Sequence, residues 1–537
     1  MTAAVSASDL RGMLADGGEL ALIDVREELI FSQSHLLLAR SVPLSRFELK
    51  FAPLVPRRST RIVLCDDSDG LAERAAAILA QNGYGNVRIL SGGIAAWSAA
   101  GFELFSGVNV PSKAFGEYIE HANGTPSIAA GELEALIRNG ADMVVLDSRP
   151  FDEYVRVSIP TATNVPGAEL VLRTRDIAPS PDTLVVVNCA GRTRSIIGAQ
   201  SLINAGLPNR VVALRNGTMG WSLEGFTCEQ GKNNRAPDAL PAMRDWARKA
   251  AQRVAQSCGA RRIDGAIVEG WRADKDRTLY IFDVRDPAEY EAGHVPDAIS
   301  APGGQLVQAT DQYAGTLGAR IVLIDDAEVR AAMTASWLRQ MGWREVFIWV
   351  EAGTETGRPK LPILDTGAPS DFGVDCAGID CAALGELLSG NAATVVDLSL
   401  SRDYLKAHIP GAWFAIRTRL KRALGKIPLA GTLVLTSEDG VLARLAVPEA
   451  AAAIDRPVRF LEGGNAAWQS VGQPFSTEAK MADEPVDQWR KPYERSGDTK
   501  AAMAEYLAWE TDLLPRIGRD GSLKFTPFTA PLRAESH

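Results

Sequence analysis

Short apolar segments that end in an aspartate recur four times along the chain. They lie at residues 21–24, 144–147, 280–283 and 394–397. A second apolar segment follows each of them at a similar distance, and these segments lie at residues 61–65, 185–189, 320–324 and 432–436. Such short, wholly apolar runs are typical of buried strands, and the stretches between them have the spacing of helices. The chain is therefore predicted to contain one structural unit in four copies.

Each copy continues into a third strand and a glycine-containing turn that opens a helix. A tryptophan follows this turn at the same spacing in three copies, as Trp97, Trp221 and Trp468, and Thr356 takes its place in the third copy. Because apolar strands alternate with helices, we expect mostly parallel sheets covered by helices on both faces. The predicted fold class is α/β, with four tandem, small, doubly wound domains. The tryptophans are expected in the cores.

The repeats also predict where the domains begin and end. Polar connectors are expected at residues 108–125, 232–257 and 367–375, with a bridging helix over 242–256. A C-terminal tail is predicted to contain one amphipathic helix over 500–514, which packs on a domain or at a subunit contact and contributes no chemistry. The predicted domains cover residues 1–107, 126–232, 256–366 and 376–478, and the tail covers 479–537.

Composition narrows the class of protein. A net charge of −9 argues against a nucleic-acid partner, for which a basic stripe is expected. The N-terminus lacks a signal-peptide pattern, and no apolar run reaches the roughly 18 residues of a membrane span. We therefore expect a cytoplasmic protein without a membrane partner. The six cysteines and five histidines form no cluster, so no disulfide framework, metal site or cofactor is predicted.

One of the second strands ends in a candidate nucleophile. Cys189 opens a tight loop that leads into a helix and carries two arginines. A thiol over the N–H groups of a helix N-terminus, beside two guanidiniums, has a lowered pKa and can bind an anion. We expect Cys189 to be catalytic, and Thr193 and Ser195 either to donate to the bound group or to cap the helix. The predicted substrate-binding residues are Ala190, Gly191, Arg192, Thr193, Arg194 and Ser195.

The other three loops lack this combination. Cys65 ends the equivalent strand of the first copy and is a second candidate thiol, but Asp66, Asp67 and Asp69 should raise its pKa and repel an anion. The third and fourth copies have Ile324 and Thr436 at the strand end, so no thiol is expected there. The second domain is predicted to be active, the first weak or inactive, and the other two inactive.

Taken together, the motifs resemble those of the rhodanese (thiosulfate sulfurtransferase) family. They are Asp-x-Arg, Glu-Tyr, His-x-Pro-x-Ala, a strand ending in cysteine, and Gly-Gly-x-x-x-Trp, and they extend over nearly the whole chain before Lys480. The chain as a whole resembles a multidomain bacterial-type member with four tandem rhodanese-like domains. The resemblance implies transfer of a sulfane sulfur from thiosulfate, through a persulfide on Cys189 with release of sulfite, to cyanide or a thiol. It also implies small anionic donors as partners and allows a homodimer.

Two features limit what the resemblance implies. Asp147 and Arg149 recur as Asp283 and Arg285 in the copy without a thiol, which favours a structural ion pair over catalysis. Many two-domain members carry a substrate-binding arginine where this chain has Glu153. The replacement weakens the implication of mercaptopyruvate as donor and leaves Arg192 and Arg194 to hold the anion.

Two other functions stay open. A cysteine-dependent phosphatase would use a similar loop, although Cys189 to Arg194 is Cys-x4-Arg and such enzymes usually have Cys-x5-Arg. A sulfur carrier or docking protein that delivers persulfide sulfur to a protein partner is favoured by the three degenerate loops.

Overall fold

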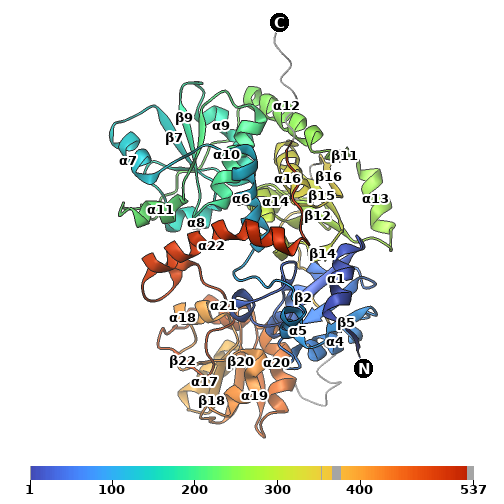
Figure 1. Ribbon diagram of the computed structural model, residues 1–537. Coiled ribbons are helices and arrows are strands. Elements are labelled where there is room, and N and C mark those ends of the chain that lie inside the picture. Colours follow the sequence, from blue (N-terminus) through green and yellow to red (C-terminus); the bar gives the residue numbers. More distant parts are fainter. Residues whose placement is uncertain (1, 352, 366–376, 529–537) are drawn as a thin grey trace.

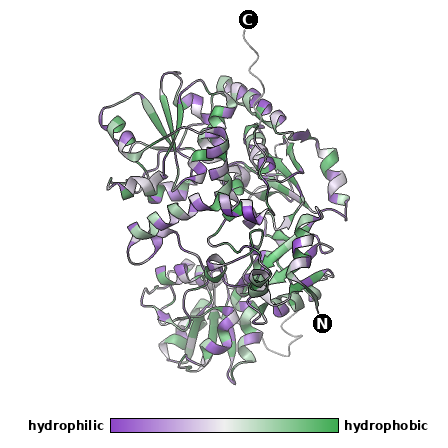
Figure 2. Ribbon diagram, viewed as in Figure 1, coloured by the Kyte–Doolittle hydropathy of each residue, from purple (hydrophilic) through white to green (hydrophobic). Residues whose placement is uncertain are grey.

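The computed structural model describes residues 2–351, 353–365 and 377–528, which form four sheets with helices packed on them (Figure 1). The named strands pair in parallel, with the exception of β14 (Thr316–Leu317), which runs antiparallel to β2 (Leu20–Asp24). The central strands are mostly apolar, whereas the helices carry both polar and apolar residues (Figure 2). The predicted α/β class is confirmed. No described helix is both long and apolar enough to cross a bilayer.

In each of the first two sheets, the first strand of the repeat lies at one edge and pairs with the last strand of the repeat. This order is that of a doubly wound unit. The first also receives β14 at its edge, from the third repeat. Its remaining elements are β1 (Ala3–Val5), α1 (Ala7–Ala15), α2 (Glu28–Gln33), β3 (Arg40–Ser41), α3 (Phe47–Leu54), β4 (Arg61–Cys65), α4 (Leu71–Gln81), β5 (Val87–Leu90) and α5 (Gly93–Ala99). The second unit contains β6 (Ser127–Ile128), α7 (Ala130–Arg138), β7 (Met143–Asp147), α8 (Phe151–Arg156), β8 (Thr163–Asn164), α9 (Leu170–Ile177), β9 (Leu184–Asn188), α10 (Thr193–Ala205), β10 (Val211–Leu214) and α11 (Gly217–Leu223).

The third and fourth sheets repeat this arrangement, and β22 adds an edge strand to the fourth. The third unit contains β11 (Arg261–Ile263), α13 (Gly265–Ala273), β12 (Leu279–Asp283), α14 (Pro287–Ala292), β13 (Ile299–Ser300), α15 (Gly303–Gln308), β15 (Arg320–Ile324), α16 (Val329–Gln340) and β16 (Val346–Trp349). The fourth contains β17 (Gly378–Ile379), α17 (Cys381–Ser389), β18 (Ala393–Asp397), α18 (Ser401–Lys406), β19 (Trp413–Phe414), α19 (Leu420–Leu424), β20 (Thr432–Thr436), α20 (Val441–Ala451), β21 (Val458–Leu461), α21 (Gly464–Ser470) and β22 (Lys480–Met481).

The predicted core residues are buried where the sequence pattern places them. Trp97, Trp221 and Trp468 are nearly inaccessible, and each indole N–H donates to a backbone carbonyl six residues further along. The second and third units share one hydrophobic core through α12 (Pro241–Ser257), which confirms the predicted bridging helix. These two units therefore hold each other in place.

The connectors and the tail differ from the expectation. Residues 110–123 form the helix α6 (Val110–Asn123), which packs against α10. The tail forms α22 (Thr499–Asp520), longer than predicted, and this helix crosses the middle of the molecule beside α6 and α11 (Figure 1). The connector expected at 367–375 lies outside the described residues. Both α6 and α22 therefore reach the loop that carries Cys189.

Candidate functional site

Strand register aligns the four loops and corrects the alignment expected from the sequence. Asp24 pairs with Cys65, Asp147 with Asn188, Asp283 with Ile324 and Asp397 with Thr436. Cys65 is therefore the counterpart of Asn188, and Cys189 lies one residue further along its chain. The counterparts of Cys189 are Asp66, Asp325 and Ser437.

The backbone around these residues supports the corrected alignment. The carbonyls of Cys189, Asp66 and Ser437 each accept an N–H from the helix that follows the third strand, at 2.8, 3.0 and 2.8 Å. A glycine stands beside the loop in each case. A Cβ on Gly217 would lie 2.3 Å from the carbonyl oxygen of Cys189, so only glycine fits there at its φ of +53°. In all three units, the glycine turn therefore packs directly against the loop.

The loop after Cys189 leaves its backbone N–H groups available. Cys189 follows β9, and α10 begins at Thr193. Within the described part of the chain, no N–H from Ala190 to Ser195 donates a hydrogen bond. The Cys189 thiol is buried and donates to the Ser195 hydroxyl at 3.6 Å. A thiol surrounded by free N–H groups at a helix N-terminus is an arrangement that can hold an anionic sulfur.

In the first and third units, a carboxylate already occupies the corresponding N–H groups. Asp66 accepts from the N–H groups of Ser68 and Ala72 at 2.9 and 3.0 Å. Asp325 accepts from those of Ala327, Arg330 and Ala331 at 3.1, 2.7 and 3.3 Å. The corresponding groups in the second unit belong to Gly191, Arg194 and Ser195.

The fourth unit uses a hydroxyl for the same purpose. Ser437 accepts from the N–H of Ala443 at 3.2 Å. Among the four loops, the one after Cys189 is therefore the one in which a thiol stands beside these N–H groups and no loop side chain accepts from any of them.

Cys65 has a different environment. The side chain is completely buried at the end of β4 and donates to the carbonyl of Ile23 at 3.5 Å. Burial, followed by the charge of Asp24, raises the pKa of this thiol well above its usual value. The direction agrees with the expectation from the acidic loop, although burial is the larger cause.

The two arginines of the loop are bound by carboxylates. Arg192 donates to Glu117 and Glu120 of α6 and to Asn216, so each of its side-chain nitrogens has a partner. Arg194 donates to Glu153 at 2.9 Å and to Gln305 of the third unit at 3.2 Å. Arg192 therefore fastens the loop to α6, and Arg194 retains its Nε–H and one Nη2–H for a ligand.

The hydroxyls of the loop have partners as well. Ser195 donates to the carbonyl of Arg192 at 2.8 Å, and Thr193 donates to Glu510 of α22 at 3.4 Å. The Ser195 bond joins the hydroxyl to the backbone at the start of α10, and no side chain caps this helix. The Thr193 bond instead joins the loop to the C-terminal helix.

The Asp-x-Arg motif is structural in the second unit. Arg149 is 1% exposed and donates from Nε and Nη2 to Asp147 at 2.9 and 2.6 Å and to the carbonyl of Val157 at 2.6 Å. The same pair forms between Asp24 and Arg26 and between Asp283 and Arg285. A pair shared by units with and without a thiol at the loop holds the fold together and is not specific to the chemistry.

A pocket of about 260 Å³ opens over Cys189, and four parts of the chain form its walls, of which one is the start of α6 with Lys113. The loop and Glu153 come from the second unit, and Gln305, Gln308 and Gln312 come from the third. Segment 489–506 closes the remaining side, with Trp489, Lys491, Tyr493 and Tyr506. The cationic lining residues are Lys113, Arg192, Arg194 and Lys491, whereas Glu153 is the acidic one.

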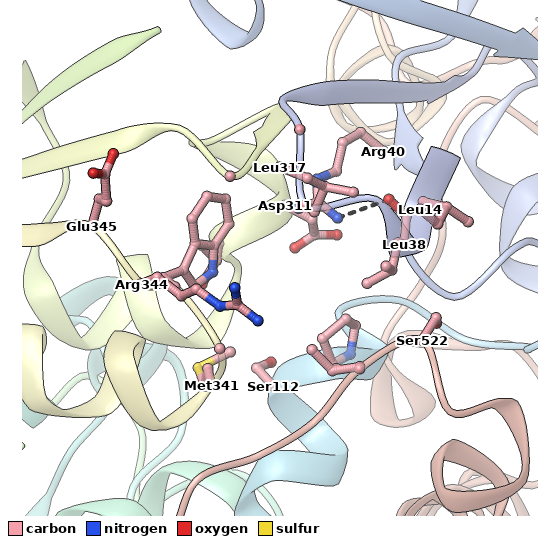
Figure 3. Close-up of a pocket in the computed structure, with 18 of the residues that line it drawn as sticks. Leu14, Leu38, Arg40, Ser112, Asp311, Leu317, Met341, Arg344, Glu345 and Ser522 are labelled. Atoms are coloured by element: carbon pink, nitrogen blue, oxygen red, sulfur yellow. Dashed lines mark hydrogen bonds between the residues drawn. The ribbon is translucent and has the colours of Figure 1, made fainter. Parts of the chain in front are cut away.

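A larger cavity, of about 460 Å³, lies between the first and third units (Figure 3). The buried Arg40 donates there to the carbonyls of Leu38 and Ala314 at 3.0 and 3.3 Å. No cysteine stands among the residues that line it. This cavity therefore cannot carry persulfide chemistry, although it is the roomier of the two.

Comparison with known proteins agrees with the repeats. The family profile described as "Rhodanese-like domain" matches residues 6–100, 129–224 and 268–355, which together make up more than half of the chain. The chain belongs to the rhodanese family. The matched rhodanese segments correspond to the first three sheets.

Two relatives extend this result. The crystal structure of a thiosulfate sulfurtransferase from Pseudomonas aeruginosa is 46% identical and has a TM-score of 0.94, covering 98% of this rhodanese and 100% of that chain. A sulfurtransferase from Allochromatium vinosum is 28% identical over 100 residues, which are 19% of this chain and 92% of that protein. The architecture of four sheets with a C-terminal helix is therefore shared along essentially the whole length of the Pseudomonas protein.

Sequence reasoning found the loop but missed part of its surroundings. All the predicted residues from Cys189 to Ser195 lie together, and the pocket is lined by those up to Arg194. The residues that it missed are Lys113, Glu153 as an anchor for cations, Lys491 and Tyr493. The tail packs on the second unit, as expected, and it also lines the pocket, which the sequence did not predict.

Proposed function

We propose that this rhodanese is a thiosulfate sulfurtransferase whose nucleophile is Cys189. The observation that carries the proposal is the set of free N–H groups from Ala190 to Ser195 around the thiol, in a loop where no side chain accepts from them. The cationic pocket lining and the similarity to the Pseudomonas enzyme support thiosulfate as the donor. The remaining three units are proposed to be inactive, and Cys65 to take no sulfur, because its thiol is buried and protonated.

The reaction has two displacement steps. The Cys189 thiolate attacks the outer sulfur of thiosulfate, a new S–S bond forms, and the S–S bond of thiosulfate breaks with its electron pair leaving on sulfite. The persulfide anion is held by the N–H groups of Gly191, Arg194 and Ser195. In the third unit, Asp325 accepts from the counterparts of these three groups. Cyanide or a thiolate then attacks the outer sulfur, and the Cys189 thiolate returns.

The test is the mass of the intact protein after incubation with thiosulfate. The wild-type chain and Cys65→Ala are expected to gain one sulfur, and Cys189→Ala is expected to gain none. Adding cyanide should remove the sulfur and release one thiocyanate for each persulfide. Absence of a mass gain, or a gain that persists in Cys189→Ala, would show that the assignment is wrong.

The two alternative functions are tested in the same preparation. Turnover of an aryl phosphate that depends on Cys189 would support the phosphatase. A persulfide that transfers to a reduced protein thiol, but not to cyanide or a small thiol, would support the sulfur carrier.

A further inference from the structure

The C-terminal segment is a fixed part of the pocket over Cys189. Arg516 of α22 donates to Glu103 of the first unit at 2.9 Å, and Lys113 of α6 pairs with the completely buried Glu510 at 2.8 Å. Met219 of the second unit packs against Met503 and Leu507 of α22. Anchors at both units hold the segment against the loop.

Within this segment, Lys491 lies opposite Arg194. Its ammonium contacts Glu153 at 3.1 Å, and Arg194 contacts the other oxygen of the same carboxylate at 2.9 Å. Burial opposes a charged Glu153, but the two cations outweigh burial and hold the pKa of Glu153 well below its usual range. The carboxylate therefore joins two cations and neutralises one of them.

The third unit contains the same carboxylate–arginine pair without a lysine beside it. Glu289 is the counterpart of Glu153 and Arg330 that of Arg194, and the two form the same ion pair. No lysine joins that pair in the described residues, and Asp325 supplies the anion internally. The additional cation thus occurs at the loop that is open to an external anion.

Tyr493 stands next to Lys491 and offers a hydroxyl to the same pocket. It lies on the 3₁₀ turn Pro492–Glu494, and the Lys491 ammonium lies 5.9 Å from the centre of its ring. Its hydroxyl has no hydrogen-bond partner among the described residues, although the rest of the side chain is half-buried. Burial and the charge of Glu153 raise the pKa of this phenol, so it stays a donor.

We infer that Lys491 and Tyr493 bind the sulfonate end of the anionic donor, whose outer sulfur faces Cys189. The inference rests on the proposed function for the identity of the donor. The loop N–H groups hold the sulfur that is transferred, and the C-terminal segment holds the group that leaves. Lys491 retains two N–H donors beyond its contact with Glu153, which suits the oxygens of a sulfonate.

The test measures charge selectivity at Cys189 without requiring sulfur transfer. Cys189 is alkylated with iodoacetate, an anion, and with iodoacetamide, which is neutral, and its modified peptide is quantified by mass. In Lys491→Gln the ratio of the iodoacetate rate to the iodoacetamide rate should fall about tenfold, because a charged hydrogen-bond donor is lost. Lys491→Arg should keep the ratio, and Lys500→Gln, an exposed charge change in the same segment, should leave it unchanged.

Kinetics give the second readout. The KM for thiosulfate should rise about tenfold in Lys491→Gln and severalfold in Tyr493→Phe, and KM should stay unchanged in Lys500→Gln. An unchanged alkylation ratio in Lys491→Gln, or an equal fall in Lys500→Gln, would overturn the inference. If thiosulfate gives no persulfide at all, the proposed function fails, whereas the alkylation ratio still reports the role of Lys491 toward an anion.

Discussion

Lys113 and Glu510 form a buried ion pair that fastens the C-terminal helix to the loop carrying Cys189. The two charged atoms lie 2.8 Å apart, and the Glu510 carboxylate also accepts from Thr193 of the loop. Burial alone would lower the pKa of Lys113, but Glu510 outweighs it and raises that pKa. The pair connects α6, α22 and the loop that carries Cys189 at one point.

Removing this pair should loosen the tail. Lys113→Met leaves Glu510 buried without its cation. The free energy of unfolding should fall by about 3 kcal/mol. We expect faster deuterium exchange of the amides in α22 and a lower rate of persulfide formation. Lys500→Met changes an exposed lysine and should leave both measurements unchanged. Equal exchange in the wild type and Lys113→Met would show that the pair does not hold the helix.

The internal carboxylates of the other loops predict the effect of Cys189→Asp. Asp66 and Asp325 accept two and three backbone N–H groups from their loops. An aspartate at position 189 should do the same, so Cys189→Asp should be more stable than Cys189→Asn by about 2 kcal/mol, in the range of hydrogen bonds to charged groups. Urea unfolding monitored at the second unit measures the difference. Equal stability of both variants would contradict the proposed role of the N–H groups.

The Asp-x-Arg pair predicts a stability effect without a specific catalytic one. Asp147→Asn removes the charge that Arg149 faces at 2.6 Å, and both groups are buried. Breaking such a pair should lower the free energy of unfolding by about 3 kcal/mol. Glu134→Gln, which removes one partner of the solvent-exposed pair with Arg138, should change it by less than about 1 kcal/mol. Asp283→Asn should resemble Asp147→Asn, since the same pair forms there.

His35 predicts a pH dependence of stability in the first unit. The imidazole is stacked on Phe31 with ring centres 4.0 Å apart, and burial lowers its pKa to about 4. Its ordinary pKa lies near 6.5. Between pH 6.5 and pH 4, the unfolded chain therefore binds a proton at this imidazole that the folded chain does not bind. Its contribution is fully present above pH 6.5 and is lost as pH falls toward 4, by about 2 kcal/mol at pH 5.

The comparison that isolates this residue is His35→Phe. Unfolding free energies of the wild type and the variant are measured at pH 7.5 and pH 5, and the wild type should lose about 2 kcal/mol more than the variant. Any constant packing effect of the substitution cancels in this difference. Parallel losses in both proteins would mean that His35 titrates normally.

The sequence by itself determined the repeated unit and the place of the proposed nucleophile. Strands, buried tryptophans, the bridging helix and the Asp-x-Arg pairs follow from local patterns, because the periodicity and the nearby partners lie within one repeat. The position of Cys189 between a strand and a helix follows for the same reason. Cys65 was aligned with it wrongly, because a strand end can be shifted by one residue without changing its apolar pattern, and the register of hydrogen bonds decides the pairing.

Only the tertiary structure decided which groups surround Cys189. Arg192 and Arg194 look like free cations in the sequence, yet Glu117, Glu120 and Glu153 bind them in the folded chain. Lys491 and Tyr493 lie some three hundred residues after Cys189 and reach it through the packing of α22 on α6 and α11. No local pattern encodes these contacts, because they depend on how separately folded units and a distant helix pack together.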